Sequence, residues 1–164
     1  MLIAVLSDTH GYLHYAEQVL KQLNGIDLLL HAGDFVSDAR KLKKTLGCNI
    51  LCVSGNCDFC AMEPKERIVE FEGVNILITH GHMYKVKYGY ERLLKRAKEV
   101  SAKIVVFGHT HKSENVTIDN VLLLNPGSTV FPRDGGNYTY AILNIKDGKA
   151  ESRICTIKSS RRLI

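Results

Sequence analysis

Short apolar runs alternate with longer amphipathic stretches through the first two-thirds of the chain. A run of five or six apolar residues between turn residues predicts a buried strand, and apolar positions at helical spacing predict a helix. This alternation is typical of βα units around a mostly parallel sheet. The predicted strands cover 2–6, 26–30, 50–53 and 104–107, and the predicted helices cover 13–23, a segment from a Ser37 cap to Gly47, and 90–100.

Hairpins are concentrated later in the chain. Three residue pairs suited to two-residue turns separate stretches that are suited to strands: Glu72–Gly73, Asp119–Asn120 and Asp147–Gly148. They predict a hairpin of 68–71 with 74–78, a second hairpin around 119–120 and a third within 138–157. These hairpins either extend the first sheet or form a second sheet packed on it, and the pattern leaves both arrangements open.

The length of 164 residues predicts a single domain, residues 1–164, without repeats or linkers. A chain of this size buries roughly 70% of the surface that its unfolded form exposes, so a metal would serve chemistry rather than folding. Apolar residues make up 45% and charged residues 24%, which excludes disordered and collagen-like chains. No apolar run approaches the length of a bilayer helix, so we expect no membrane partner.

The beginning MLIAVLSDTHG has no basic segment before its apolar residues, so we expect a cytoplasmic protein. Five cysteines, an odd number, do not suit a secreted disulfide framework. Cys57 and Cys60 form a CxxC pair. We interpret them as two buried or incidental thiols rather than as a redox site or a structural zinc site. The net charge of +5 is spread over scattered lysines, with local clusters at 95–98 and 159–164. This distribution is typical of solvent-exposed helix faces.

Residues able to bind metal ions follow the ends of five predicted strands within a few positions. The carboxyl ends of strands in an open α/β sheet converge on one crevice, so these side chains should meet in space. Glycines 11, 33, 55, 81 and 108 suit the same turns, because glycine allows a positive φ or a close backbone approach. The candidates are Asp8, His10, Asp34, Asn56, His80, His109 and His111.

This donor set predicts two metal ions. Two carboxylates, one amide and four imidazoles exceed what one four-coordinate zinc takes. A carboxylate shared by two cations roughly 3.5–4 Å apart would trap a water molecule, lower its pKa and leave positions for phosphoryl oxygens. Mixed nitrogen and oxygen donors favour Mn, Ni, Co, Fe or Zn over Ca and Mg, and the identity stays open.

Five short motifs carry these candidates in order along the chain: Asp8-Thr9-His10, Gly33-Asp34, Gly55-Asn56-Cys57-Asp58, His80 within THGH, and Gly108-His109-Thr110-His111. Together they resemble the calcineurin-like metallophosphoesterase superfamily, and the short length and GNCD block resemble its small bacterial and archaeal phosphodiesterase branch. Five ordered motifs are far more specific than any one of them. The resemblance implies an α/β fold, a four-layer α/β/β/α sandwich of two mixed β-sheets flanked by helices.

The resemblance also implies an activity, a metal-dependent phosphoesterase that hydrolyses phosphodiester bonds with a hydroxide held between two metal ions. By matching position, Asp34 would bridge the metals and Asn56 could donate its amide hydrogens to the substrate phosphate. Asn56, His80 and His109 are the implied catalytic residues. One metal would be held by Asp8, His10, Asp34 and His111, and the other by Asp34, Asn56, His80 and His109.

Cys57 departs from the family pattern. Members with efficient phosphomonoesterase activity tend to have histidine at this position, where it helps to stabilise the transition state or protonate the leaving oxygen. A thiol is a poorer proton donor at neutral pH than an imidazolium. We therefore expect a preference for phosphodiesters with good leaving groups over monoesters, although a packing role for Cys57 stays open.

Several other residues allow two interpretations. His31 is expected as a buried supporting residue rather than a ligand, whereas His82, two positions after His80, could reach a metal or phosphate. The tyrosines at 84, 88 and 90, near two lysines, could border a substrate cleft, and core packing or an oligomer contact is an equal alternative.

Two other function classes compete with a small-phosphodiester hydrolase. The retromer scaffold subunit resembles this fold but departs from a complete ligand set, so a non-catalytic protein-interaction scaffold is one alternative. The positive charge gives slight support to a nuclease, and the substrate could be a nucleotide, although no basic stripe interleaved with aromatics is visible. Two-fold assemblies are common among small enzymes, so a homodimer is the default expectation.

Overall fold

A computed structural model describes residues 1–157, and the basic segment 159–164 lies outside the described residues. The first of its two five-stranded sheets has the order β10-β9-β1-β2-β3. β1, β2 and β3 are parallel, whereas the hairpin of β9 and β10 is added antiparallel along β1. The strands are β1 Leu2–Leu6, β2 Leu28–His31, β3 Asn49–Cys52, β9 Tyr138–Lys146 and β10 Lys149–Ile157.

The second sheet has the order β4-β5-β6-β8-β7. β5, β6 and β8 run parallel in its centre, and β4 and β7 pair antiparallel at its edges. One late hairpin thus extends the first sheet while the other two build the second, so both of the arrangements left open by the sequence occur. The strands are β4 Glu66–Phe71, β5 Val74–Thr79, β6 Ile104–Val106, β7 Ser113–Ile118 and β8 Val121–Pro126.

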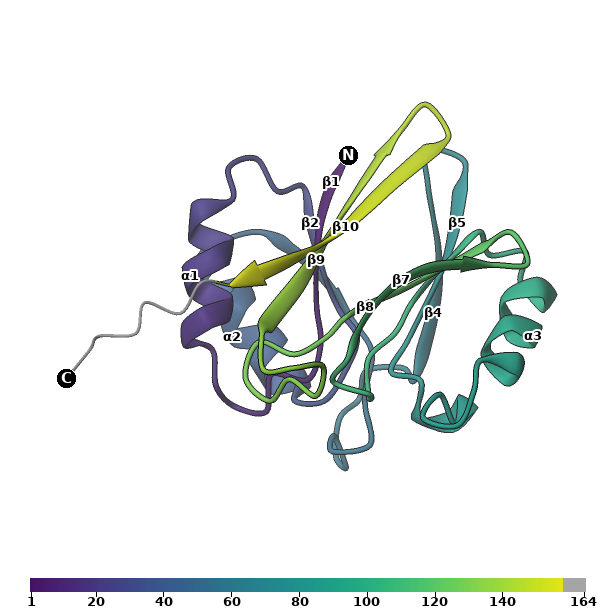
Figure 1. The fold of residues 1–164 in the computed structure, drawn as a ribbon. Coiled ribbons are helices and arrows are strands. Elements are labelled where there is room, and N and C mark those ends of the chain that lie inside the picture. Colours follow the sequence, from purple (N-terminus) through teal and green to yellow (C-terminus); the bar gives the residue numbers. More distant parts are fainter. Residues whose placement is uncertain (158–164) are drawn as a thin grey trace.

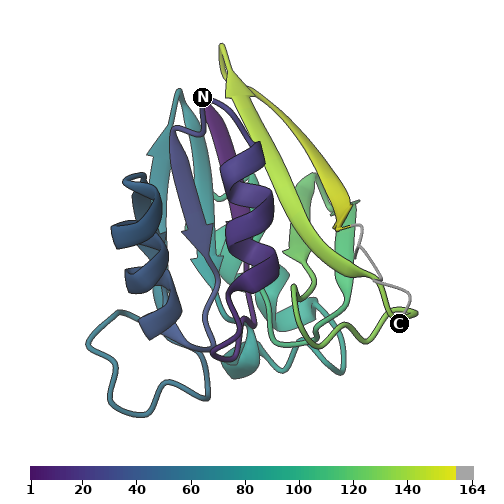
Figure 2. The same ribbon diagram turned by 90° about the vertical axis from the view of Figure 1, so that its left-hand side faces the viewer.

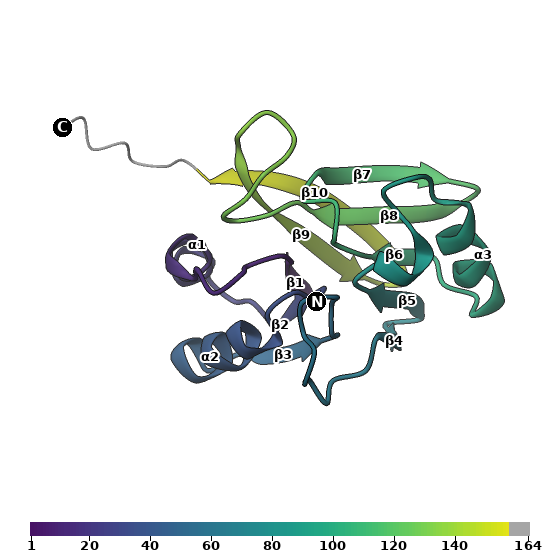
Figure 3. The same cartoon turned by 90° about the horizontal axis from the view of Figure 1, so that it is seen from below.

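Helices cover the outer face of each sheet. α1 (His14–Gln22) and α2 (Val36–Leu46) lie side by side over the first sheet, as Figure 2 shows, and α3 (Glu91–Glu99) covers the second. Seen from below, the layers follow one another from α1 and α2 through both sheets to α3 (Figure 3). The expected four-layer α/β/β/α sandwich is therefore confirmed.

Three apolar clusters hold these layers together. The central cluster fills the space between the sheets and includes Val5, Ile76 and Ile104. A second cluster joins α3 to the second sheet, and a third joins α1 and α2 to the first sheet. Each helix contributes apolar residues three or four positions apart, such as Leu93, Leu94 and Ala97 of α3, so its inner face is buried.

All three predicted hairpin turns are confirmed. Glu72, Asp119, Asn120 and Asp147 each have a φ between 49° and 61°, the left-handed region that two-residue hairpin turns require. The second residue of each turn is glycine or asparagine, and both residue types tolerate a left-handed backbone. The structure also contains a short 3-10 helix, η1 (His82–Tyr84), that the sequence pattern did not predict.

The start of α2 differs from the prediction. Ser37 lies inside the helix and is exposed, and the residue before the helix is Phe35, with a left-handed φ of 73°. No side chain at the N-cap bonds the first turn. Instead, Oδ1 of Asp58 accepts the Val36 N–H at 2.8 Å, so the capping group comes from a distant loop. The predicted end is confirmed, because Gly47 is the left-handed C-cap.

The topology brings the ends of the central strands to one edge of the molecule. The parallel strands of both sheets end at the edge drawn at the bottom of Figure 1. The other edge carries the hairpin turns at 72–73, 119–120 and 147–148. The first two turns precede the parallel strands β5 and β8, and the third joins β9 to β10. Among residues 1–157, no helix combines the length and the apolar character needed to cross a membrane.

Candidate metal centre

Asp8 is anchored by two donors on one side of its carboxylate. It follows β1, is fully buried, and its Oδ2 accepts the Ser7 hydroxyl at 2.6 Å and the His109 N–H at 3.0 Å. Oδ1 is buried without a hydrogen-bond partner among the described residues, and it lies 3.2 Å from Nε2 of His111. Burial raises the pKa of Asp8, but His111 and His80 outweigh that effect and leave the pKa below its usual value.

Asp34 lies opposite, after β2. Its Oδ1 accepts the Cys57 N–H at 2.9 Å and lies 3.4 Å from Nε2 of His80, while Oδ2 lies 3.8 Å from Nε2 of His10. Burial alone would raise the pKa of Asp34, and contacts with His80 and Cys57 reverse the direction and hold the pKa far below its ordinary value. Asp34 therefore connects the loops after β1, β2, β3 and β5.

Two histidines have their tautomers set by backbone carbonyls. Nδ1 of His80 lies 2.8 Å from Ala32 O, and Nδ1 of His111 lies 2.8 Å from Phe131 O. A carbonyl oxygen can only accept, so both Nδ1 atoms carry the hydrogen and both Nε2 atoms turn toward the carboxylates. This is how proteins orient imidazoles that bind metals.

Two further candidates, His10 and Asn56, extend the group of donors. Nε2 of His10 lies 3.2 Å from Nε2 of His111, and Oδ1 of Asn56 lies 3.2 Å from Nε2 of His80. His109 stands farther back, with its ring centre 5.1 Å from that of His80. Ligand atoms within 4.8 Å of one another form three groups: Asp8 with His10 and His111, His10 with Asp34 and Cys57, and Asp8 with Asp34 and His80.

Backbone strain is concentrated at these positions. Five of the seven candidates have a left-handed backbone that residues with a side chain rarely adopt. Such conformations cost on the order of 1–3 kcal/mol each and persist where the surrounding structure enforces them, typically at functional sites. The five are Asp8 (φ 55°), His10 (46°), Asp34 (56°), His109 (70°) and His111 (58°).

Glycines allow the loops to approach so closely. A Cβ on Gly55 would overlap Oδ1 of Asp34, and a Cβ on Gly108 would overlap the Ser7 hydroxyl. Neither glycine has a positive φ, so close approach rather than backbone conformation explains these two positions. The expectation that glycines permit the turns beside the site is confirmed here.

A buried network behind the site was missed by the sequence analysis. Asp38, on α2, is fully buried, and its Oδ2 accepts the Thr9 hydroxyl at 2.9 Å and the Gly11 N–H at 2.7 Å. Because Thr9 donates its hydrogen to Asp38, Nε2–H of His31 must donate to Thr9, across 3.1 Å. His31 is thus a buried supporting residue, as predicted. In the sequence, Asp38 resembles the solvent-exposed acidic residues of an amphipathic helix, so no pattern predicted its burial.

Three other polar residues hold the loops. The hydroxyl of Ser128, in the turn after β8, donates to Asp8 O at 2.9 Å, and Asn125 donates to Gly108 O at 3.0 Å. Asp58 accepts the Gly55 N–H at 2.9 Å in addition to Val36 N–H, which fixes the loop before Asn56. Asp58 therefore orients the loop that carries Asn56.

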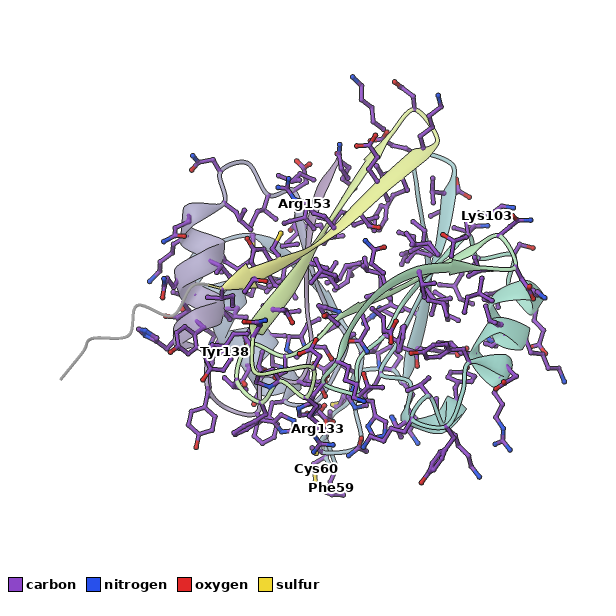
Figure 4. All side chains as sticks on the ribbon, viewed as in Figure 1. Phe59, Cys60, Lys103, Arg133, Tyr138 and Arg153 are labelled. Carbon is purple, nitrogen blue, oxygen red and sulfur yellow. The ribbon has the colours of Figure 1, made fainter. Side chains whose placement is uncertain are left out.

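Cys57 contacts the site, whereas Cys60 does not contribute to it. Burial, together with Asp34 as hydrogen-bond partner and charge, raises the pKa of the Cys57 thiol to about 11. Cys60 is exposed beside Phe59 on a loop at the lower end of the molecule, where Arg133 also lies (Figure 4). All five cysteines are free, so residues 1–157 contain no disulfide.

Comparison with known proteins identifies the family. Residues 1–148 match the calcineurin-like phosphoesterase superfamily domain. The chain belongs to this superfamily. It is 30% identical to a probable metallophosphoesterase, YsnB of Bacillus subtilis, over 93% of this chain and 89% of that protein.

Two solved structures have the same fold. A novel archaeal phosphodiesterase is 26% identical, with a TM-score of 0.75 over 94% of this chain and 100% of that chain. Vps29 of Entamoeba histolytica, solved in complex with zinc, is 20% identical, with a TM-score of 0.76 over 96% and 100% of the two chains. At that identity the second likeness shows the fold alone.

The donor set fits the metal ions that the phosphoesterase family implies. An unpartnered carboxylate oxygen in a buried position, Oδ1 of Asp8, is costly unless a cation compensates it. A cation could replace the hydrogen bond between Nε2 of His10 and Nε2 of His111, since the lone pairs of both atoms can face a metal. Both Nε2 atoms oriented by carbonyls are free to serve as ligands. The described residues therefore suit divalent metal ions.

Proposed function

We propose that this protein is a phosphodiesterase that uses two divalent metal ions at the candidate metal centre. The observation that carries the proposal is the unpartnered Oδ1 of Asp8, which faces Nε2 atoms from His111 and His80 beside Asp34. One metal is assigned to Asp8, His10, Asp34 and His111, and the other to Asp34, Asn56, His80 and His109. The name of the archaeal phosphodiesterase supports the reaction class.

Metal ions bound there would polarise the substrate phosphate and lower the pKa of the water molecule that attacks phosphorus. Asn56 is exposed at the mouth of the site, and its amide group can donate to a phosphate oxygen. His109 lines the same pocket of about 550 Å³, together with Lys87 and Arg133, whose positive charges favour an anionic substrate. Ser7, Ser128 and the Asp38 network keep the loops in position.

The direct test is metal analysis of protein purified without chelator, followed by hydrolysis of bis(p-nitrophenyl) phosphate with added Mn, Ni, Co or Mg. We expect bound metal and metal-dependent turnover. Asp34→Asn should lose both, since it removes the charge shared by the two sites, whereas Asp147→Asn, a matched change at the opposite edge, should keep both. Absence of bound metal and of metal-dependent turnover in the wild type would overturn the proposal.

Cys57 supplies a test of substrate preference. A thiol is a weaker proton donor than an imidazolium, so diesters with good leaving groups should be preferred over monoesters. Cys57→His should lower the ratio of diester to monoester kcat/KM by roughly tenfold or more, in line with general acid catalysis. An unchanged ratio, with metal content retained, would show that position 57 does not set the preference.

The second candidate is a non-catalytic scaffold, because the fold that Vps29 shares does not by itself determine catalysis. The oriented imidazoles of His80 and His111 and the strained backbone of the candidate ligands argue against it, because a scaffold needs neither. Bound metal without turnover on any diester would favour the scaffold. The cytoplasmic location and the homodimer stay predictions, tested by fractionation and by light scattering.

A further inference from the structure

A second pocket opens beside the metal centre. It has a volume of about 710 Å³, within the range of roughly 300–1,000 Å³ that is common for ligand sites. The segment from η1 to the start of α3 forms it, and His109 closes the side toward the metal centre. Lys87 lines both this pocket and the one at the metals, so the two are contiguous.

The pocket carries an excess of positive charge. Lys85, Lys87 and Arg92 line it against one carboxylate, Glu91. Among residues 1–157 none of these three cations forms an ion pair or a side-chain hydrogen bond. Arg96, one turn further along α3, is by contrast paired with Glu66 and Glu99. The three cations that face the pocket are thus unpaired, unlike Arg96.

The segment that carries Lys85 and Lys87 is held in place by its neighbours. Val86, between Lys85 and Lys87, is 4% exposed and packs into the cluster under α3. The hydroxyl of Tyr84 donates to Glu66 on β4. With Val86 anchored inward, the two lysines are exposed on either side of it.

The second pocket lies next to the candidate metal centre. His109, one of the candidate ligands, lines both pockets. A substrate group that extends past His109 therefore meets the cations of the second pocket. Tyr88, 90% exposed at the pocket, offers an aromatic face beside the cations.

We infer that this pocket, which we call the second anion site (Lys85, Lys87 and Arg92), binds a further phosphate group of the substrate while its diester phosphorus lies at the metals. The inference rests on the proposed function and narrows its substrate class to diesters with at least two phosphates. Cationic side chains bind phosphate oxygens by charge-assisted hydrogen bonds, and each such contact changes affinity by roughly tenfold or more. A nucleotide and a non-nucleotide phosphate share this chemistry.

Two substrate pairs test the site. The first is ethyl p-nitrophenyl phosphate and its analogue with a phosphate on the far carbon of the ethyl group. The second is a dinucleotide with and without a terminal phosphate. In each pair the wild type should hydrolyse the doubly phosphorylated member with a kcat/KM at least roughly tenfold higher, from the same contacts. Preference in the second pair alone assigns the site to nucleotides, and preference in both assigns it to phosphate esters in general.

The variant Lys85→Ala/Arg92→Ala should bring the preference close to one, mainly through a higher KM for the doubly phosphorylated member. Lys44→Ala, an exposed lysine on α2 outside the pocket, should keep the wild-type preference. Metal content and Tm verify that each variant is folded. Equal rates within both pairs, or a preference that survives in the double variant, would overturn the inference. Failure of the wild type on every diester would instead overturn the proposed function.

Discussion

At the scale of single residues, this protein places strained and buried groups where chemistry is proposed. Positive φ angles at Asp8, His10, Asp34, His109 and His111 require the neighbouring chain to enforce them. The hydrogen bonds from Ser7, Ser128 and Thr9 do this locally. A substitution at a supporting residue should therefore change metal affinity without removing a ligand.

Gly55→Ala tests the close approach to Asp34. The added methyl group would overlap Oδ1 of Asp34, so the carboxylate must shift. We expect at least a roughly tenfold loss of metal affinity, comparable to loss of a partner of a ligand, measured by calorimetric titration. Gly25→Ala, where a Cβ meets no atom within 4 Å and φ is 75°, should lower stability by about 1 kcal/mol and leave affinity unchanged. Equal affinities in both variants would contradict this explanation.

His31 should make stability depend on pH. Burial lowers its pKa from 6.5 to about 4, and its Nδ1 has no hydrogen-bond partner among the described residues to receive a second proton. Between these values the unfolded chain binds more protons than the folded one, so the free energy of unfolding falls as the pH drops from about 6.5 to about 4 and then levels off. The contribution is on the order of 3 kcal/mol.

The measurement is urea unfolding of wild type and His31→Gln across this range. Glutamine can still donate to Thr9 but does not titrate, so its unfolding free energy should depend less on pH. Parallel curves for the two proteins would exclude His31 as the source.

At the scale of elements, distant side chains set boundaries that local sequence does not. Ser37 suggested the start of α2 because serine is a common N-cap. The actual first turn is bonded by Asp58, 22 positions away, and its entry residue Phe35 is left-handed. The hairpin turns were predictable because each needs a left-handed backbone that glycine, asparagine and aspartate favour locally.

Asp58→Ala should destabilise the protein by about 1–2 kcal/mol, the usual cost of losing a helix cap, because Val36 N–H and Gly55 N–H both lose their acceptor. Chemical denaturation measures the change. Glu17→Ala removes an acidic group from the exposed i, i+4 pair with Lys21 and should cost less than about 0.5 kcal/mol. A cost for Asp58→Ala no larger than for Glu17→Ala would contradict the capping role.

At the scale of the whole molecule, the family motifs predicted both the fold and the positions of the candidate ligands. The apolar runs located the strands, but their pairing order could not be obtained from periodicity, since it depends on contacts between distant segments. β8, for example, lies between β6 and β7. The burial of Asp38 was not predicted, for a related reason. The loop at 9–11 covers this residue, and nothing in its own helix indicates that burial.

Metal binding should stabilise the entire protein. A ligand that binds only the folded state at a hundred times its Kd adds roughly 2.7 kcal/mol, which corresponds to a rise in Tm of roughly 5–10 °C at this size. Thermal unfolding with and without Mn after chelation measures it. The Tm of Asp34→Asn should rise little with Mn. An equal rise in Tm for the variant and the wild type would show that Mn binds outside the candidate metal centre.

The separation of the two edges has a practical consequence. The candidate ligands and Arg133 lie where the central strands end, while Lys103, just before β6, lies toward the opposite end with the tight turns (Figure 4). A dye, affinity handle or solid support attached through the turn at 147–148 would leave the other end open to the medium. The protein is therefore suited to immobilisation in one orientation, with every molecule presenting the same face to dissolved compounds.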